Sequence, residues 1–292
     1  MYNFKRLAEL IELTKETNLS IVDIIIERER ELTNKSEDEI RAKMAKALAV
    51  MREAIETGLT ENIKSTSGLS GGDAQLLVDA QQRGNTITGT LLSSAIAKAI
   101  AVAEVNAAMG RIVAVPTAGS CGILPGVLLA VAEDKNLDDE VIIDGLFVAS
   151  GIGLIIAKQA TVSGAEGGCQ AECGSAAAMA AGAIVYMLEG KEEQVLDAVA
   201  IALKNVLGLV CDPVGGLVEI PCIKRNAGGA SNALTAAELA LAGIKSHIPA
   251  DEVIVTMKKI GKTLAPQLKE TSLGGLAVTP TGCKLKDELL SK

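Results

Sequence analysis

The sequence predicts an all-α protein: a single compact bundle of long apolar helices joined by Gly-rich loops, with a charged helical N-terminal arm. Hydrophobic residues make up 49% of its 292 residues, yet aromatic residues make up only 1%. Small side chains let helices approach closely, whereas β-sandwiches rely on aromatic and β-branched residues in their strands. Apolar residues recur at helical spacing, as at Leu196, Val199 and Leu203. Strand signals are few, and RIVAVPT at 111–117 is the best short candidate.

The N-terminal arm begins the chain as a series of charged amphipathic helices over residues 4–58. Ser20 is expected to cap one helix. Ser36, followed three residues later by Glu39, has the pattern of a capping box at the start of the next. The chain is therefore expected to consist of two parts, a helical arm at 1–60 and a helical domain with one core at 61–292.

The rest of the chain alternates apolar helices with loops rich in glycine and proline. Helices are expected at 88–109, 138–160, 171–190, 191–210, 226–243 and 250–268. Loops are expected at 65–75, 115–126, 163–169 and 211–222. No repeat period and no low-complexity linker interrupts this pattern, which favours a single packed unit.

Composition and charge exclude several classes of function. The net charge is −8 and the sequence pI is near 5.0, so the chain lacks the basic surface and the stacking aromatics that nucleic acid requires. The apolar runs GLFVASGIGLIIA and CGSAAAMAAGAIVYML have 13 and 16 residues, short of the roughly 20 that span a bilayer. The charged start, MYNFKRLAELIELTKE, does not resemble a secretory signal. We therefore expect a cytoplasmic protein without membrane or nucleic-acid partners, whose six cysteines are reduced thiols or metal ligands.

Three of the cysteines stand beside glycine or proline turns: Cys169 in EGGCQ, Cys211 in LVCDP and Cys222 in IPCIK. Loops backed by rigid helices suit a metal or cluster site, because glycines allow close backbone approach and leave N–H groups free for sulfide. The absence of a CxxC pair argues against a zinc ribbon. Cysteine is also among the most buried residue types, so these residues alone leave two readings open, buried packing or metal binding.

A Ser-His-Asp triad and a phosphate-binding loop are both disfavoured by the sequence. His247 is the lone histidine and lies in KSHIPAD before a helix, so a Ser-His-Asp triad within this chain would depend on it alone. The stretch IGKT at 260–263 suggests a phosphate loop, but position 256 is Thr256 where the first glycine is needed.

Four segments carry a resemblance to a known family: VPTAGSCGILPGVL, SGAEGGCQAE, NVLGLVCDPVGGLVEIPCIKRNA and ETSLGGLAV. They resemble the signature segments of the alpha subunit of bacterial iron–sulfur L-serine dehydratases, and the resemblance extends from about residue 60 to 283. It implies a [4Fe-4S] cluster held by Cys169, Cys211 and Cys222, with one iron open to substrate. Cys121 and Cys173 match no ligand position of the family and are interpreted as packing.

The resemblance also implies a role for Cys283. Family members carry a cysteine near the C-terminus that reaches the active site and occupies the open iron until substrate displaces it. Cys283 follows ETSLGGLAVTPTG at nearly the right distance, but nine residues follow it where single-chain relatives tend to stop. Both readings therefore stay open, a catalytic ligand and an ordinary exposed thiol.

The implied reaction is the α,β-elimination of water from L-serine, giving pyruvate and ammonia. The open iron would act as a Lewis acid on the β-hydroxyl. A base must remove the Cα proton, and the resemblance implies that a histidine loop on a separate beta subunit supplies it. We therefore expect a hetero-oligomer that needs this beta subunit for activity, with a homodimer as a further assembly.

Hydroxyl-bearing loops are the candidates for substrate binding. Ser65, Thr66, Ser67 and Gly68 offer hydroxyls and free backbone N–H groups to the substrate carboxylate. Thr117 lies on a second such loop, and Asn226 is expected to line the site, while Arg225 is left open between carboxylate binding and the surface.

Three other functions remain as alternatives. The chain could be a cluster lyase acting on L-cysteine, because the sequence does not distinguish a β-hydroxyl from a β-thiol. It could also be a non-catalytic helical partner subunit whose cysteines only pack. A pyridoxal-phosphate dehydratase ranks low, since no phosphate loop with a nearby Schiff-base lysine is present.

Overall fold

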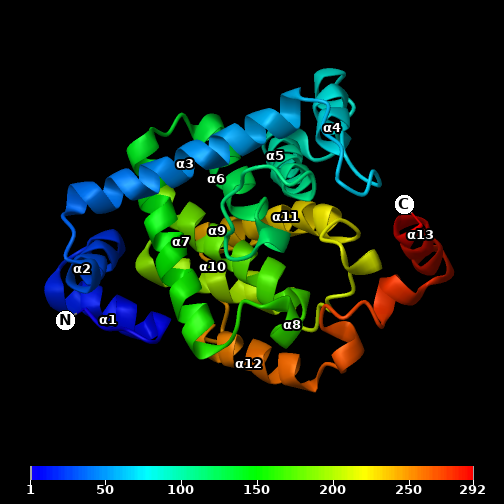
Figure 1. The fold of residues 1–292 in the computed structure, drawn as a ribbon. Helices are drawn as coiled ribbons and strands as arrows, with labels where there is room; N and C mark the ends of the chain where they lie inside the picture. The colour runs from blue at the N-terminus through cyan, green and yellow to red at the C-terminus, as the bar shows by residue number, and fades with distance from the viewer. Residues whose placement is uncertain (1, 292) are drawn as a thin grey trace.

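The computed structural model describes residues 2–291 and, within them, builds thirteen α-helices and no strand (Figure 1). The all-α fold class is confirmed. The helices are α1 (Leu7–Thr17), α2 (Ile21–Thr33), α3 (Glu37–Thr60), α4 (Asp73–Gln82), α5 (Gly89–Ala107), α6 (Ile123–Lys135), α7 (Asp139–Gln159), α8 (Gly164–Gly167), α9 (Ser175–Met187), α10 (Glu192–Lys204), α11 (Cys222–Leu241), α12 (Ala250–Thr263) and α13 (Pro280–Leu290).

The expected short strand at 111–117 is wrong. This segment is irregular and connects α5 to the turn before α6. The one β-type pairing among residues 2–291 is an isolated bridge between Cys211 and Lys269, far from this segment in the sequence. Without a neighbouring strand the backbone groups of 111–117 have no ladder to join, and Ile112, Val113 and Val115 pack against the hydrophobic core instead.

The centre of the bundle is α9, which packs against α6, α7, α10 and α11. Every residue of α9 except Tyr186 is buried. Its sequence, SAAAMAAGAIVYM, presents small side chains on all sides. A Cβ added at Gly182 would lie 2.5 Å from Cδ1 of Ile152 on α7, so this glycine permits the close approach of the two helices.

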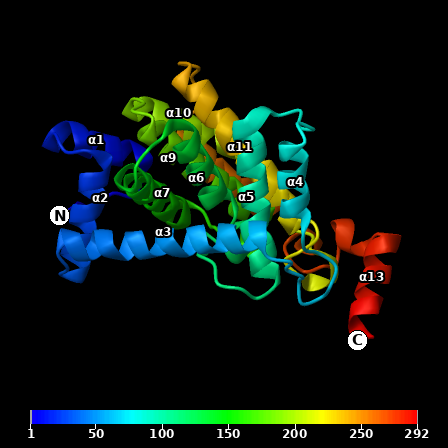
Figure 2. The same cartoon turned by 90° about the horizontal axis from the view of Figure 1, so that it is seen from above.

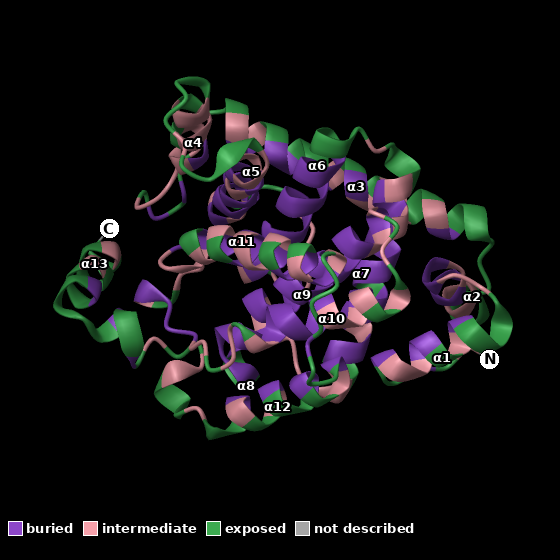
Figure 3. Ribbon diagram, turned by 180° about the vertical axis from the view of Figure 1, so that it is seen from behind, coloured by how far each residue is buried: buried purple, intermediate pink, exposed green. Residues whose placement is uncertain are grey.

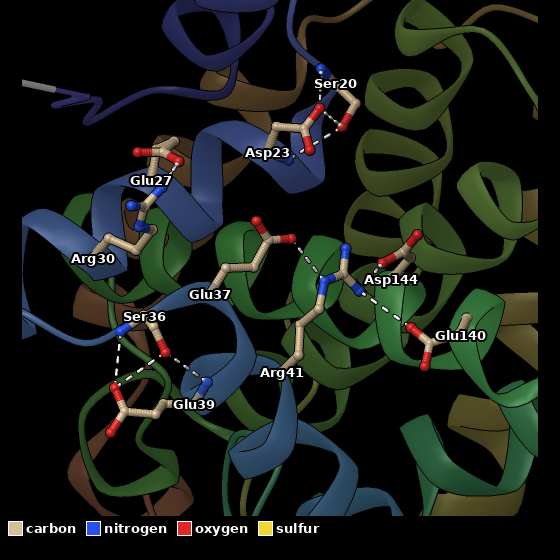
Figure 4. A network of polar contacts seen from close by, with 10 residues as sticks. All are labelled: Ser20, Asp23, Glu27, Arg30, Ser36, Glu37, Glu39, Arg41, Glu140 and Asp144. Carbon is tan, nitrogen blue, oxygen red and sulfur yellow. Dashed lines mark hydrogen bonds and ion pairs between the residues drawn. The ribbon is translucent and has the colours of Figure 1, made fainter.

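Hydrogen bonds define the start of each helix in the N-terminal arm. Ser20 and Ser36 both form capping boxes, with Asp23 and Glu39 respectively, so both caps are confirmed (Figure 4). These bonds satisfy N–H groups that the first helical turn leaves without partners.

The arm is joined to the rest of the fold. Nη1 of Arg41 on α3 lies 2.9 Å from Oδ1 of Asp144 on α7, and the same guanidinium contacts Glu37 and Glu140 (Figure 4). Buried residues of α1, α2 and α3 belong to the same hydrophobic core as those of α7 and α9. Figure 2 shows α3 lying lengthwise across one side of the bundle.

Two helices, α5 and α7, are long and apolar enough to cross a membrane by length and composition alone. However, most of the apolar stretch of each helix is buried inside the fold. These helices contact α3, α6, α9 and α11 among others, as core helices do.

The C-terminal part of the described chain lies at the opposite end of the molecule from the N-terminus (Figures 1 and 2). After α12 the chain runs through two 3-10 turns, η4 (Pro266–Leu268) and η5 (Gly275–Val278), and ends in α13. Figure 3 shows buried residues concentrated in the central helices, whereas α13 is largely exposed. Residues 266–279 are called the C-terminal strap below.

Candidate functional site

The three cysteines singled out by the sequence come from three separate elements. Cys169 begins a π-helical turn, η2 (Gln170–Gly174), that leads into α9. Cys211 lies in the loop after α10, and Cys222 is the first residue of α11. Cys169 and Cys211 are each only 4% exposed, while Cys222 is partly accessible. A π-helical turn is rare and is frequently found at functional sites.

The same three thiols are electrostatic neighbours. The pKa of Cys222 is raised to about 12, chiefly by burial and also by the charges of Cys169 and Glu172. Burial likewise raises the pKa of Cys211, with Glu172, Cys169 and Cys222 all contributing. The charges of Cys169 and Cys222 both act on Cys211, and that of Cys169 acts on Cys222, so the fold brings the three thiols into one region.

Within residues 2–291, no group of three His, Cys, Asp or Glu side chains surrounds a point where a single metal ion could sit. A four-iron cluster makes a different demand, because each of its cysteines binds a different iron and the sulfurs stay apart.

Cys173, interpreted from the sequence as packing, is buried against Cys169. Their Sγ atoms are 3.4 Å apart and hydrogen-bonded. The pKa of Cys169 is lowered chiefly by this hydrogen bond and also by the nearby Arg225, against the effect of burial. The pKa of Cys173 is raised by the same hydrogen bond and by burial. Of the two, Cys169 is thus the thiol that more readily becomes a thiolate.

Arg225 is a fixed cation beside these thiols. It donates from Nη1 to the carbonyl of Val210 and from Nη2 to Oδ1 of Asp212, both at 2.8 Å. Burial lowers the pKa of Arg225, but the charges of Cys169 and Asp212 outweigh it and raise the pKa above its usual value. Arg225 is therefore not a surface residue, and its charge favours thiolates in the loop that it braces.

Glu172 is a functional candidate that the sequence analysis missed. Its Oε1 accepts a hydrogen bond from Oγ1 of Thr117 at 2.9 Å, and Sγ of Cys211 lies 3.7 Å from its Oε2. A Cβ added at Gly164 would lie 2.4 Å from Oε2, so the carboxylate rests against the backbone of the 163–169 loop. Burial raises the pKa of Glu172, against the effect of the Thr117 hydroxyl. The one signal in the sequence is an acidic residue three positions after Cys169.

The C-terminal strap fastens the Cys211 loop from outside. The N–H of Cys211 donates to the carbonyl of Leu268 at 2.9 Å, and the N–H of Glu270 donates to the carbonyl of Cys211 at 2.8 Å. The N–H of Leu276 donates to Oδ2 of Asp212 at 2.7 Å. Gly275 has φ +61°, and a Cβ there would lie 2.3 Å from Oδ2 of Asp212. The ETSLGGLAV segment thus holds the loop that carries one predicted ligand.

The 65–70 loop is anchored to residues just before Cys222. Oγ of Ser67 and Oγ of Ser70 donate to Oε2 of Glu219, at 2.8 and 2.7 Å, and Glu219 is only 3% exposed. Oγ of Ser65 lies 3.1 Å from Oγ of Ser67, so both hydroxyls face inward.

The remaining residues of this loop are more open. Thr66 is exposed and, with Ser67, Gly215 and three residues of α13, lines a hollow of about 300 Å³. The N–H of Gly68, expected to be free for a carboxylate, instead donates to the carbonyl of Ser65 at 3.0 Å. The prediction that this N–H is free is therefore wrong, because the N–H forms the hydrogen bond of the turn itself.

Asn226 is buried and makes three hydrogen bonds that join two site loops. Its Oδ1 accepts from the N–H of Gly122 at 2.9 Å, and its Nδ2 donates to the carbonyls of Gly119 and Cys222 at 2.8 and 2.9 Å. Those bonds hold the 115–122 loop, and with it Thr117, against the start of α11.

Cys283 lies apart from the buried thiols. It is exposed in the first turn of α13, and its Sγ lies 4.0 Å from the carbonyl oxygen of Ala277 within its own segment. Its role as an iron ligand stays a prediction.

Similarity to known proteins identifies the family of this chain. The sequence model of the family described as serine dehydratase alpha chain matches residues 16–277. The chain belongs to the serine dehydratase alpha chain family. The resemblance noted in the sequence is confirmed, and the cysteine loops, Glu172 and residues 266–277 of the strap lie within the matched residues.

Individual relatives in this family are similar over nearly the whole chain. A protein of Bacillus subtilis named "Probable L-serine dehydratase, alpha chain" is 53% identical over 98% of this chain and 95% of that protein. The L-serine dehydratase alpha chain of Peptoniphilus asaccharolyticus is 45% identical over 97% of each. The L-serine dehydratase of Streptomyces coelicolor is 40% identical over 97% of this chain but only 62% of that longer protein.

Proposed function

We propose that this chain is the alpha chain of an L-serine dehydratase, a lyase that converts L-serine to pyruvate and ammonia by α,β-elimination of water. Family membership and the relatives' names support the assignment. The observation that carries the chemistry is the gathering of Cys169, Cys211 and Cys222, with Arg225 and Glu172, in one half-buried region.

We further propose that Cys169, Cys211 and Cys222 hold a [4Fe-4S] cluster. The donor set fits, because iron–sulfur clusters are bound by cysteine thiolates and the Arg225 charge offsets part of their negative charge. When bound with three protein ligands, such a cluster supplies an open iron that acts as a Lewis acid on the β-hydroxyl of serine. Gly164 leaves space beside Sγ of Cys211, since a Cβ there would lie only 3.1 Å from that sulfur.

The residues of this chain would bind and orient the substrate. The exposed hydroxyl of Thr66 is the group of the 65–70 loop best placed to meet a substrate carboxylate, with Glu219 fixing the loop through Ser67 and Ser70. Thr117 is positioned by its hydrogen bond to Glu172, and Asn226 positions the whole Thr117 loop. These residues would hold serine against the thiol-bearing loops.

The base that removes the Cα proton would come from a beta chain. His247 is exposed after the C-terminal end of α11, whereas Cys222 is at its N-terminal end, and a helix of 20 residues is roughly 30 Å long. The chain spans 95% and 97% of two proteins named alpha chains but 62% of a longer L-serine dehydratase. A separate chain supplying the remaining part would complete the site and make the enzyme a hetero-oligomer.

We also propose a cytoplasmic location. All six cysteines are free thiols in the structure, Cys169 and Cys173 included despite the contact of their sulfurs. A reducing compartment keeps such thiols available for iron and sulfide.

The cluster is tested by anaerobic reconstitution with iron and sulfide, followed by iron quantitation and the visible absorption spectrum. We expect about four irons per chain, lost in Cys169→Ala, Cys211→Ala and Cys222→Ala but retained in the buried controls Cys121→Ala and Cys173→Ala. Wild-type protein without iron under these conditions would contradict the cluster.

The reaction is tested separately, by purifying the reconstituted chain with and without a coexpressed beta chain. We expect pyruvate from L-serine only when both chains are present, and a molar mass above that of one alpha chain. L-cysteine is assayed beside L-serine, and faster sulfide release than serine turnover would favour the cysteine lyase. A mass of two alpha chains without a beta chain would show the homodimer.

A further inference from the structure

Glu172 lies where three site loops meet. It accepts from Thr117 of the first loop, rests against Gly164 of the second and lies 3.7 Å from Sγ of Cys211 on the third. A Cβ at Gly119 would also lie 3.3 Å from its Oε1, so little can separate this carboxylate from the loop backbones. The position of the carboxylate is therefore fixed by contacts from all three loops.

Three acids lie at the site, Asp212 and Glu219 buried and Glu172 partly buried, and they are neutralised differently. Asp212 pairs with Arg225 at 2.8 Å, and Glu219 accepts hydrogen bonds from the hydroxyls of Ser67 and Ser70. No ion pair among residues 2–291 includes Glu172, whose partners are one hydroxyl and one thiol. Burying a carboxylate away from water without a cation is costly, and such a group in a site is a candidate for binding a cationic ligand.

L-serine carries three polar groups that a site must match. The proposed function places its carboxylate at the 65–70 loop and its β-hydroxyl at the thiol-bearing loops. The third group is an α-ammonium, for which a carboxylate is the strongest side-chain acceptor. Arg225 and the thiols cannot take this role, since a cation repels ammonium and the thiols are assigned to iron.

We propose that Glu172 binds the α-ammonium group of L-serine. Thr117 holds Oε1 at one side, which leaves the other lone pairs of the carboxylate for the ammonium N–H groups. Glu172 is thus a substrate-binding residue that selects amino acids over hydroxy acids. This inference rests on the proposed function and adds the group that recognises the amine.

The test compares two ligands that differ only in the amine: L-serine, and 3-hydroxypropanoate, which keeps the carboxylate and the hydroxyl. Binding of 3-hydroxypropanoate to the reconstituted two-chain complex is measured by anaerobic calorimetry, and KM and kcat are measured for L-serine, which the complex is expected to convert. The variants are Glu172→Gln, which keeps the acceptor for Thr117, and Glu172→Asp, which keeps the charge. Glu166→Gln, on the exposed neighbouring α8, is the matched control.

We expect Glu172→Gln to weaken L-serine binding and raise its KM by about 10- to 100-fold, the range for a lost charge-assisted hydrogen bond. Binding of 3-hydroxypropanoate should stay within about twofold, and iron content should not change. Glu172→Asp should recover part of the loss, and Glu166→Gln should match wild type.

Two results would overturn the inference. Equal weakening of both ligands would mean that Glu172 only shapes the site, and a fall in kcat with unchanged KM for L-serine would make it a proton-transfer group instead. The proposed function fails in a different way, when wild-type complex lacks iron or does not act on L-serine. In that case L-serine is not converted, and calorimetric affinities for both ligands still decide whether Glu172 recognises the amine.

Discussion

Helix α9 and the Cys211 loop are both buried, but they are held in place by different forces. The helix is surrounded by α6, α7, α10 and α11, and its position results from the summed packing of many small side chains. The loop is held by single directional bonds from distant segments: the strap through Leu268 and Leu276, and α11 through Arg225. One altered residue in the core should therefore change stability, whereas one in the loop should change iron binding.

Gly164→Ala should have the largest effect on the site. The added Cβ would lie 2.4 Å from Oε2 of Glu172 and 3.1 Å from Sγ of Cys211, which must both move. We expect most of the iron and activity to be lost, at a cost in unfolding free energy of about 1–3 kcal/mol. Iron per chain and chemical denaturation measure the two effects, with the exposed neighbour Ala165→Ser as control. Full iron content in Gly164→Ala would show that the site is not sensitive to such displacement.

Gly275→Ala should have the next largest effect, because it loosens the strap. The left-handed backbone, φ +61°, costs about 1–2 kcal/mol for alanine, and the Cβ would also displace Asp212. Gly243→Ala is a matched control: its φ is +86°, but nothing lies within 4 Å of its Cβ position.

Both variants should lose a similar amount of unfolding free energy, because alanine is strained at a positive φ. Only Gly275→Ala should also lose iron and activity. Reconstituted iron content and a denaturation curve for each decide this. Equal iron content in the two would mean that the strap does not position the Cys211 loop.

Gly126→Ala tests the core side of the comparison. Gly126 on α6 packs against α5, and a Cβ there would lie 2.7 Å from the backbone nitrogen of Ala99. We expect a loss of about 1–3 kcal/mol in unfolding free energy, with iron per folded chain unchanged.

The control for Gly126→Ala is Gly228→Ala, at an exposed helical glycine on α11 with nothing within 4 Å. It should gain about 0.5–1 kcal/mol, since alanine favours helix more than glycine does. Iron loss in Gly126→Ala would break the distinction between core and loop.

The same distinction explains what the sequence could predict. Apolar periodicity and capping boxes are local signals, so most helices of the core and the caps at Ser20 and Ser36 could be predicted from the sequence. Helix α6 was not assigned because Pro125 and Gly126 read as a loop, although proline is tolerated in the first helical turn. Helices α4 and α13 are polar and exposed and carry only a weak apolar pattern.

The site was less predictable than the fold because its contacts join residues far apart in the chain. The ligand set Cys169, Cys211 and Cys222 came from family resemblance, since spacing alone left packing and metal binding open. Glu172 was missed, because its lack of a cation partner is a tertiary property that no local pattern reveals. Asp212 and Glu219 were missed for the same reason, since the partner of Asp212 is Arg225 on α11 and the partners of Glu219 are serines some 150 positions away.

Cys283→Ser should have the smallest effect, because it changes an exposed residue outside both the core and the Cys211 loop. Cys283 is exposed on α13, a helix that packs against η5 and the 3-10 turn η3 (Val214–Gly216) rather than against the central bundle. If α13 keeps this position when the cluster is bound, removing the thiol should leave iron content and KM for L-serine within about twofold of wild type. If the tail instead reaches the open iron, it competes with substrate, and Cys283→Ser should lower KM and alter the visible spectrum of the substrate-free cluster.

Anaerobic spectra and KM for wild type and Cys283→Ser, with the neighbouring exposed Thr281→Ser as control, separate these outcomes. A lowered KM would extend the strap's role from holding the Cys211 loop to closing the site, and would make α13 the part of the fold that moves on substrate binding.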